Sequence, residues 1–481
     1  MVTHEPEGYM VIFNRYIPVP IIFLGPLICL MLNVMLFILI IKNRPEYLRD
    51  YQLNINPDSL DYVLLGRNVF LLKEYSRSSE APYVSDVFRT PAYPLFSGAL
   101  DIVGGGALIY LTQVLLQSLN CVIIFLLTQK LFGKTAALIA SLLCATDVML
   151  AVLNFEALSE AVYVPLISIS ALVLIPQALA QERSRHTSFF LGGMLIGIAT
   201  YVRPAGPYLP LVYAIATLVV GLWGIGWKKA LINSVTVPLG AVILLAPWIV
   251  RNQVVFGIPH LTTNDTIVLV YYTGAGAYQV HHGVDQQTAQ QMIAEEFGLR
   301  PPEEMWNYWK SDLSPKDMDD PARAAVPEIL GKYPLDLARS SAIGIMKASI
   351  SHNVNELGGV LGKTWTAPRL DRILRFDGSA IAALVENQTG LVAIFVWEVL
   401  HAACVIALAC AGLFWGMCTR QRRMIGVVLL ILQTFFVATV GAYGLEAYSR
   451  LRAPVMPLAY VTAGYALAMI FFAYRTRFPG T

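Results

Sequence analysis

Long apolar runs recur along the chain and constrain its fold more than any other feature. Most of them reach or approach the roughly 20 residues that a helix needs to cross a bilayer. A backbone in lipid must satisfy its own hydrogen bonds, which favours helices. The runs cover residues 17–41, 107–127, 135–153, 157–180, 188–202, 207–226, 230–249, 390–416, 424–442 and 454–473. The sequence therefore predicts an all-α polytopic membrane protein with about ten transmembrane helices, and the runs 135–153 and 188–202 are candidates for broken or half-buried helices.

The overall composition supports the same class. Hydrophobic residues make up 56% of the 481 residues and charged residues only 14%, whereas an ordinary soluble domain carries about 25% charged residues. The net charge of +2 gives no indication of nucleic-acid binding. We therefore expect membrane lipids as partners and no nucleic acid.

Basic residues in the short connections predict the orientation of the chain. Clusters of Lys and Arg occur in every other connection between the spans. The side of the membrane that carries more of these basic residues is normally cytoplasmic. This rule places two long loops, residues 42–106 and 251–389, on the outer face. Lys42, Arg44 and Arg49 argue for the opposite orientation, because they follow the first span on its outer side. The basic residues in the remaining connections are more numerous and favour the first orientation.

The loops divide the chain into three parts. Residues 1–250 form an N-terminal transmembrane bundle that includes the first outer loop, residues 251–389 form an outer region, and residues 390–481 form the C-terminal transmembrane helices. Within the outer region, Asp285 is a predicted N-cap of a helix that stops at Gly298, and residues 334–351 form a second predicted helix. Both long loops are expected to contain juxtamembrane helices.

Asp58 opens a helical pattern just after the first span. One interpretation is structural, because an aspartate at a helix N-terminus is a good cap and Asp61 could complete a capping box. The other interpretation is chemical, because a carboxylate beside the bilayer can act as a base. The two are not exclusive, and the spacing alone favours the cap.

A second acidic position lies at the edge of a later span. Glu156 and Glu160 are four residues apart, so they share one face if the segment is helical. Glu160 precedes the apolar run, where a carboxylate is costly unless it has a partner or a task. It is equally compatible with a helix-end charge and with an active-site residue.

Four arginines on the outer side are candidate anion ligands, because a planar guanidinium can grip a phosphate with two parallel hydrogen bonds. Arg89 stands in a stretch stiffened by Pro91 and Pro94. Arg89 can instead anchor the chain at the lipid headgroups, and Arg450 and Arg452 can instead pair with Glu446. The four are Arg89, Arg203, Arg450 and Arg452.

Several of these segments, in their order, resemble the polytopic glycosyltransferases that use a polyprenyl-phosphate sugar. These are the protein O-mannosyltransferase and aminoarabinose transferase relatives of the C-type glycosyltransferase fold. The resemblance rests on PDSLDY at residues 57–62, RTPAYP at 89–94, LSE at 158–160, RPAG at 203–206 and RLRAP at 450–454. It covers most of the chain.

The resemblance implies a role for each candidate residue. Asp58 matches the family's catalytic aspartate and Glu160 its second acidic residue, and Arg89 matches the basic residue that meets the donor phosphate. Arg450 and Arg452 resemble the basic pair before the last span, and Arg203 is a further candidate for the phosphate. The expected partners are a polyprenyl-phosphate sugar and an acceptor that is a lipid, a glycan or a protein.

The implied reaction is an inverting displacement at the sugar's anomeric carbon, with Asp58 as general base on an acceptor hydroxyl. We expect this reaction at the periplasmic or outer face of the cell's inner (plasma) membrane, where it would contribute to cell-envelope glycans. No cofactor is expected. No metal is expected either, because His281 and His282 form the only close histidine pair and lack a nearby third ligand.

Two alternatives remain open. A transporter or flippase of lipid-linked sugars would also need many spans and a basic outer rim. A ligase that moves a whole glycan from a polyprenyl carrier would share the chemistry. The sequence leaves the sugar and the acceptor undetermined.

Overall fold

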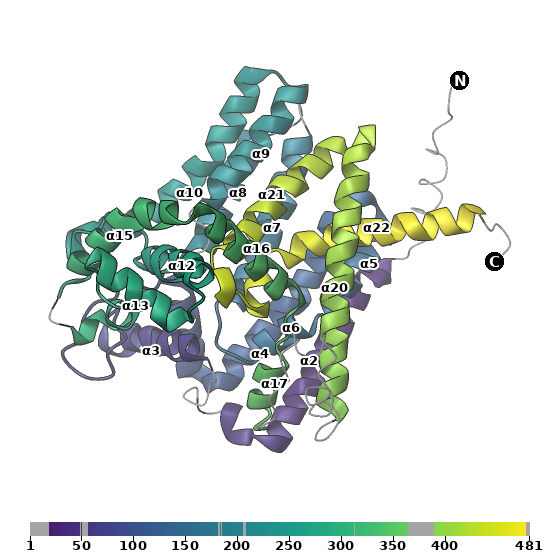
Figure 1. Cartoon of the computed structure of the whole chain (residues 1–481). Coiled ribbons are helices and arrows are strands. Elements are labelled where there is room, and N and C mark those ends of the chain that lie inside the picture. The colour runs from purple at the N-terminus through teal and green to yellow at the C-terminus, as the bar shows by residue number, and fades with distance from the viewer. Residues whose placement is uncertain are drawn as a thin grey trace.

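The protein is helical throughout its described residues. The structure, a computed structural model, describes residues 19–48, 50, 56–180, 183, 185–204, 208–311, 313–363 and 389–477. Within these ranges no extended strand forms, and the chain builds a helical bundle with a layer of shorter helices on one side (Figure 1). The predicted all-α class is confirmed.

Seven helices of the described residues are long and apolar enough to cross a membrane. They are α2 (Leu24–Asn43), α4 (Ala92–Phe132), α7 (Glu160–Leu179), α10 (Trp227–Phe256), α20 (Thr389–Cys418), α21 (Arg423–Gly441) and α22 (Met456–Arg477). Three shorter apolar helices are α5 (Lys134–Ala145), α8 (His186–Val202) and α9 (Leu209–Gly224). Each apolar run of the sequence therefore contains an apolar helix, as expected of a polytopic membrane protein.

The run 135–153 is broken, as its length suggested. Helix α5 ends at Ala145, and α6 (Val148–Leu153) begins after Asp147, whose side chain accepts a hydrogen bond from the backbone N–H of Leu150. Asp147 is thus an N-cap inside the apolar run. This break is the kind that a membrane protein tolerates where other helices surround it.

Large apolar side chains point outward from several long helices. Met31 and Ile38 on α2, Val242 on α10 and Trp397 on α20 are all at least half exposed. Exposed apolar surface of this extent is unfavourable in water and favourable in lipid. In Figure 1, α20 runs as a long, nearly straight helix, and α22 crosses it; these two helices also pack closely.

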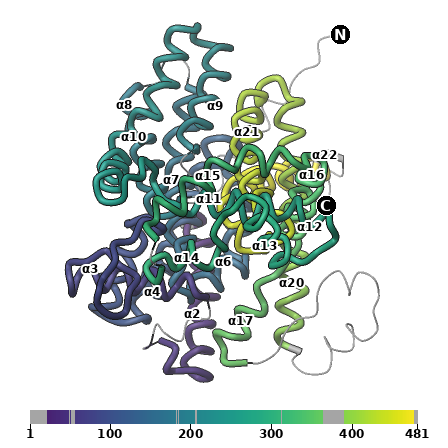
Figure 2. Tube along the Cα trace, turned by 60° about the vertical axis from the view of Figure 1, so that its left-hand side comes forward, coloured from purple at the N-terminus to yellow at the C-terminus, as the bar shows by residue number. Residues whose placement is uncertain are grey.

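The shorter helices between α10 and α20 gather on one side of the bundle (Figure 2). They are α11 (Asn264–Val268), η5 (Leu269–Gly274), α12 (Ala275–His282), α13 (Gln286–Phe297), α14 (Pro302–Trp306), η6 (Tyr308–Lys310), α15 (Pro315–Lys332), α16 (Pro334–Ile350) and α17 (Val354–Val360). The caps of α13 are as predicted, since Asp285 accepts from the N–H of Thr288 and Gly298 ends the helix with a positive φ. The predicted helix over 334–351 is α16.

The remaining elements are single helical turns at the edges of the long helices. They are η1 (Val19–Phe23), η2 (Pro45–Leu48), η7 (Arg420–Arg422), η8 (Gly444–Glu446) and η9 (Ser449–Arg452). The last of these carries two of the candidate arginines directly before α22.

Helix α3 (Pro57–Leu72) holds the start of the first loop against the N-terminal part of α4. Its N-cap is Asn56, whose side chain accepts from the backbone N–H of Asp58. The interpretation of Asp58 as the cap is therefore wrong. Because Asn56 satisfies the helix end, the carboxylate of Asp58 is left to pair with other side chains.

The contact between α3 and α4 depends on two glycines. A Cβ atom on Gly98 would lie 2.4 Å from backbone atoms of Gly66, and one on Gly66 would lie 2.0 Å from the carbonyl oxygen of Pro94. Neither helix can carry a side chain here without moving apart. The approach places Asp58 and Arg89, which flank this contact, on one rigid unit.

We expect Gly98→Ala to destabilise the protein by about 1–3 kcal/mol, because the added methyl group overlaps backbone rather than a movable side chain. The measurement is the thermal unfolding midpoint of purified protein in detergent. Gly331→Ala is the matched control, since a Cβ at this helical glycine meets nothing within 4 Å. Equal midpoints for the two variants would contradict the close packing of α3 on α4.

Candidate functional site

Asp58 lies between two arginines that come from opposite ends of the chain. Its Oδ1 accepts from Nη2 of Arg89 at 2.6 Å, and its Oδ2 accepts from Nη2 of Arg450 at 2.7 Å. Arg89 lies in the first loop, just before α4, and Arg450 belongs to η9. Each oxygen of the carboxylate is thus held by a different guanidinium.

Glu160 is a second carboxylate that binds Arg450. Its side chain is fully buried at the start of α7, and its Oε1 lies 2.7 Å from Nη1 of Arg203. The Nε of Arg450 donates to the same oxygen, and Arg203 also donates to the hydroxyl of Ser159 at 3.1 Å. Arg450 therefore bridges Asp58 and Glu160.

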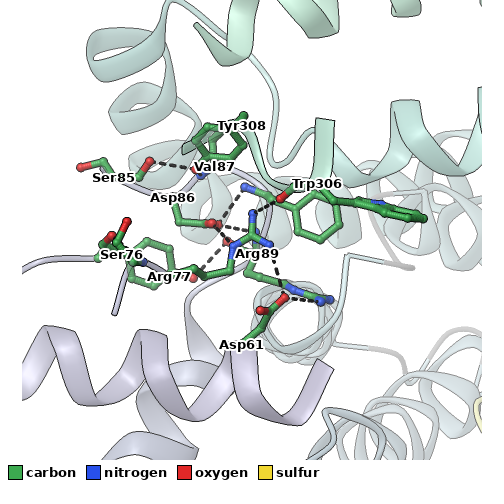
Figure 3. A network of polar contacts seen from close by, with 12 residues as sticks. Asp61, Ser76, Arg77, Ser85, Asp86, Val87, Arg89, Trp306 and Tyr308 are labelled. Atoms are coloured by element: carbon green, nitrogen blue, oxygen red, sulfur yellow. Dashed lines mark hydrogen bonds and ion pairs between the residues drawn. The ribbon is translucent and has the colours of Figure 1, made fainter. Parts of the chain in front are cut away.

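The network continues on the other side of Arg89. Nη2 of Arg89 also donates to Oδ2 of Asp61 at 2.8 Å, and Nη1 of Arg77 approaches the same oxygen at 3.3 Å. Arg77 donates from Nε to Asp86 at 2.5 Å and from Nη2 to the carbonyl oxygen of Trp306 (Figure 3). The first loop is thereby joined to α14.

Together these contacts form a chain of alternating charges. We call it the charge chain; its members are Asp86, Arg77, Asp61, Arg89, Asp58, Arg450, Glu160 and Arg203. Four carboxylates face four guanidinium groups, so the chain as a whole is neutral. Most of its members are buried or half-buried, where an unpaired charge would be strongly unfavourable.

The arginines keep Asp58 ionised. Burial raises the pKa of Asp58, but the neighbouring positive charges of Arg89 and Arg450 outweigh that effect, so the pKa lies well below its usual value. In this state the carboxylate is a weak base. It becomes a stronger base when its two guanidinium partners are drawn away.

Arg452 does not join the charge chain. Its Nη1 donates to the carbonyl oxygens of Ala348 and Ser351 at 2.9 and 2.5 Å, and its Nη2 lies 3.5 Å from Glu398 on α20. Although Arg450 and Arg452 are two residues apart, the tight turn of η9 directs them to different partners. The alternative of a pairing with Glu446 is therefore wrong, because Arg450 pairs with Asp58 and Glu160 and Arg452 with Glu398.

Part of this network has no signature in the sequence. Arg77 and Asp86 stand in no recognisable pattern, and the position of Asp61 indicates only a capping residue. The structure brings together the predicted residues Asp58, Glu160, Arg89, Arg203 and Arg450. In the described part of the chain, no group of three or more His, Cys, Asp or Glu side chains is arranged to hold a metal ion.

Glu156 is a further acidic residue beside this site. It lies in the turn between α6 and α7, so the prediction that it shares a helical face with Glu160 is wrong. The residue is only 1% exposed, and among the described residues neither carboxyl oxygen has a hydrogen-bond partner. Burial raises the pKa of Glu156 to about 7, Arg450 opposes the shift, and Glu356, Glu160 and Asp58 add to it.

The raised pKa of Glu156 predicts a stability that falls with pH. Between its usual value of 4.5 and about 7, the folded protein keeps a proton that the unfolded chain releases. The free energy of unfolding should therefore fall by about 3 kcal/mol over this range and then level off. Glu156→Gln cannot ionise and should lose this component of the slope, as measured by unfolding at several pH values. An unchanged slope in the variant would refute the assignment.

Removing Arg450 should destabilise the fold. Arg450→Gln leaves two buried or half-buried carboxylates each short of one partner, and we expect a loss of about 3 kcal/mol in the free energy of unfolding. Arg339→Ala serves as control, because Arg339 is 69% exposed and its ion pair is on the surface; it should change stability by less than about 0.5 kcal/mol. A similar small effect for both variants would mean that the charge chain is not buried.

Comparison with known proteins supports the resemblance seen in the motifs. Residues 96–250 match the model of the family described as dolichyl-phosphate-mannose-protein mannosyltransferase. A comparison with curated protein sequences finds no match.

The chain is also similar to solved structures. The oligosaccharyltransferase of Archaeoglobus fulgidus in its apo form superposes with a TM-score of 0.52 at 15% identity, covering 96% of this chain and 52% of that one. The same archaeal enzyme, AglB, in complex with an inhibitory peptide and a dolichol-phosphate gives 0.47 at 15% identity over 93% and 51% of the two chains. ArnT from Cupriavidus metallidurans bound to undecaprenyl phosphate gives 0.37 at 15% identity over 92% and 79%.

The present chain thus spans about half the length of the archaeal oligosaccharyltransferase whose fold it shares. The family match runs from within α4 into α10 and includes Glu160 and Arg203. These findings confirm the resemblance to the polyprenyl-phosphate-dependent glycosyltransferases of the C-type fold.

Proposed function

We propose that the protein is a membrane glycosyltransferase that moves a sugar from a polyprenyl-phosphate carrier to an acceptor hydroxyl. The observation that carries this proposal is the placement of Asp58 between Arg89 and Arg450, with one carboxylate oxygen on each guanidinium. The same two guanidinium groups suit a phosphate, and the carboxylate suits a general base. The family match and the shared fold support the choice of a lipid-linked donor.

Donor binding would change the partners of the two arginines. The donor's phosphate is a diester with one negative charge, and its free oxygens can accept several charge-assisted hydrogen bonds. Its negative charge grows as the sugar leaves and a polyprenyl phosphate monoester forms. Arg89 and Arg450 would turn from Asp58 to the phosphate, and the pKa of Asp58 would rise toward its usual range. The base would therefore be uncovered only when the donor is in place.

The reaction would then be a single displacement. Asp58 accepts the proton of the acceptor hydroxyl, and the hydroxyl oxygen forms a bond to the anomeric carbon. The bond from that carbon to the phosphate oxygen breaks, its electron pair stays on the phosphate, and the anomeric configuration inverts. Arg89 and Arg450 stabilise the charge that develops on the leaving group.

Glu160 and Arg203 would hold this arrangement in place. Glu160 is fully buried and contacts both Arg203 and Arg450, so it keeps Arg450 aimed at the donor while Asp58 is released. Arg203 is the second cation on Glu160 and could bind the donor phosphate if the phosphate displaced this pairing. Arg452 has other partners, so the proposal uses Arg89, Arg203 and Arg450 as the donor-binding set.

The proposed site would face the periplasm or exterior across the cell's inner membrane. The basic connections place residues 42–106 and 251–389 on that side. In the structure the two regions meet, because Arg77 of the first loop donates to the carbonyl oxygen of Trp306 and the hydroxyl of Tyr308 donates to the carbonyl oxygen of Ser85 (Figure 3). The outer helices would cover the site and limit hydrolysis of the donor.

A second candidate is a ligase that transfers a whole glycan from the lipid carrier. The fold shared with an oligosaccharyltransferase favours it over a transporter. It would use the same base and the same phosphate ligands. The size of the transferred group distinguishes a transferase of single sugars from a ligase of whole glycans. Mass spectrometry of the product measures this size directly.

The test is turnover by detergent-purified protein with synthetic polyprenyl-phosphate sugars and a panel of lipid, glycan and peptide acceptors. Asp58→Asn should lower kcat by at least about 100-fold, because the amide cannot accept the proton. The turnover is compared at a temperature at which the variant is folded, because Arg89 and Arg450 lose their carboxylate partner and the unfolding midpoint should fall as well. Asp336→Asn, in the outer helix α16, is the control and should keep full turnover. Headgroup translocation without turnover by the wild type, or full activity of Asp58→Asn, would contradict the proposal.

A further inference from the structure

Four buried polar atoms, on three residues in or beside the charge chain, have no hydrogen-bond partner in the described part of the structure. They are both oxygens of Glu156, one oxygen of Glu356 and the Nη1 of Arg450. They belong to fifteen such orphan side-chain atoms among the described residues. A buried polar group without a partner is costly, so this group calls for an explanation.

These groups lie in one place. Phe155 and Ala157, on either side of Glu156, share a hydrophobic core with Val354 and Leu357, which flank Glu356 on α17. Arg450 acts on both carboxyl groups, since its charge lowers the pKa of each against the raising effect of burial. The turn before α7, helix α17 and η9 therefore each contribute one polar side chain to this region, namely Glu156, Glu356 and Arg450.

Arg450 connects this region to the proposed reaction centre. Its Nε is taken by Glu160 and its Nη2 by Asp58, which leaves Nη1 as the orphan. A ligand that contacts Nη1 is thus held by the same planar group that contacts the base.

The orphan atoms belong to two carboxyl groups and one guanidinium, and this combination limits the kind of ligand that can bind. Two carboxyl groups disfavour an anion, and the guanidinium disfavours a simple cation. A hydroxyl group both donates and accepts, so it can donate a hydrogen bond to a carboxyl oxygen and accept one from Nη1. Vicinal hydroxyls on a rigid ring satisfy several of the orphan groups at once.

We propose that Glu156, Glu356 and Arg450 bind the ring hydroxyls of the donor's sugar. This inference rests on the proposed function, because it takes the sugar to be attached to a polyprenyl phosphate held by Arg89 and Arg450. The site orients the ring so that its anomeric carbon faces Asp58. Glu156 and Glu356 are then determinants of which sugar is transferred.

The test compares binding of glycosylated and bare carriers to the purified full-length chain. The probes are dolichyl phosphate and dolichyl phosphates that carry mannose, glucose or galactose. The wild type should bind at least one glycosylated probe about ten-fold more tightly than dolichyl phosphate. Glu156→Gln should bring this ratio close to one while leaving the affinity for dolichyl phosphate unchanged.

Controls separate this inference from the proposed function. Asp319→Asn removes the charge of another buried carboxyl with an orphan oxygen, on α15, and should keep the wild-type ratio. Glu356→Gln provides a second variant if Glu156→Gln unfolds, and it should also lower the ratio. A wild type that prefers no glycosylated probe, or variants that keep its preference, would overturn the sugar site. Failure of the wild type to bind dolichyl phosphate at all would instead refute the proposed function.

Discussion

Arg450 draws together carboxylates that lie far apart in the sequence. It contacts Asp58 at the start of the first loop and Glu160 at the start of α7, from a position just before α22. A buried guanidinium without these partners would be strongly unfavourable. The first loop, the turn before α7 and the C-terminal segment are therefore held in one arrangement, and the candidate site exists only when the whole bundle has assembled.

The neutrality of the charge chain explains how such a site remains responsive. Four carboxylates pair with four guanidinium groups, so their charges cancel and none of them is left without an opposite charge. An entering phosphate would disturb the balance at Asp58, the half-exposed member between Arg89 and Arg450. The orphan groups of Glu156 and Glu356 lie outside this balance, which is why a neutral, hydroxyl-bearing group suits them better than another charge.

Much of the fold could be predicted because apolar runs of span length leave little choice but helices. The ends of α13 were also predictable, since Asp285 and Gly298 act through their own local geometry. The cap of α3 was not, because Asn56 and Asp58 are both good capping residues and only the tertiary pairing of Asp58 decides between them. Likewise, Arg450 and Arg452 look alike in sequence, and the turn of η9 alone separates their partners.

The network around the site was only partly predictable. Asp58, Arg89, Glu160 and Arg450 stand in recognisable motifs, whereas Arg77 and Asp86 meet through the fold of a polar loop that has no periodicity (Figure 3). The most direct test of the account is an experimental structure with dolichyl phosphate bound. We expect phosphate oxygens within hydrogen-bond distance of Arg89 and Arg450 and a carboxylate of Asp58 released from both. A phosphate bound elsewhere, with both guanidinium groups still on Asp58, would contradict it.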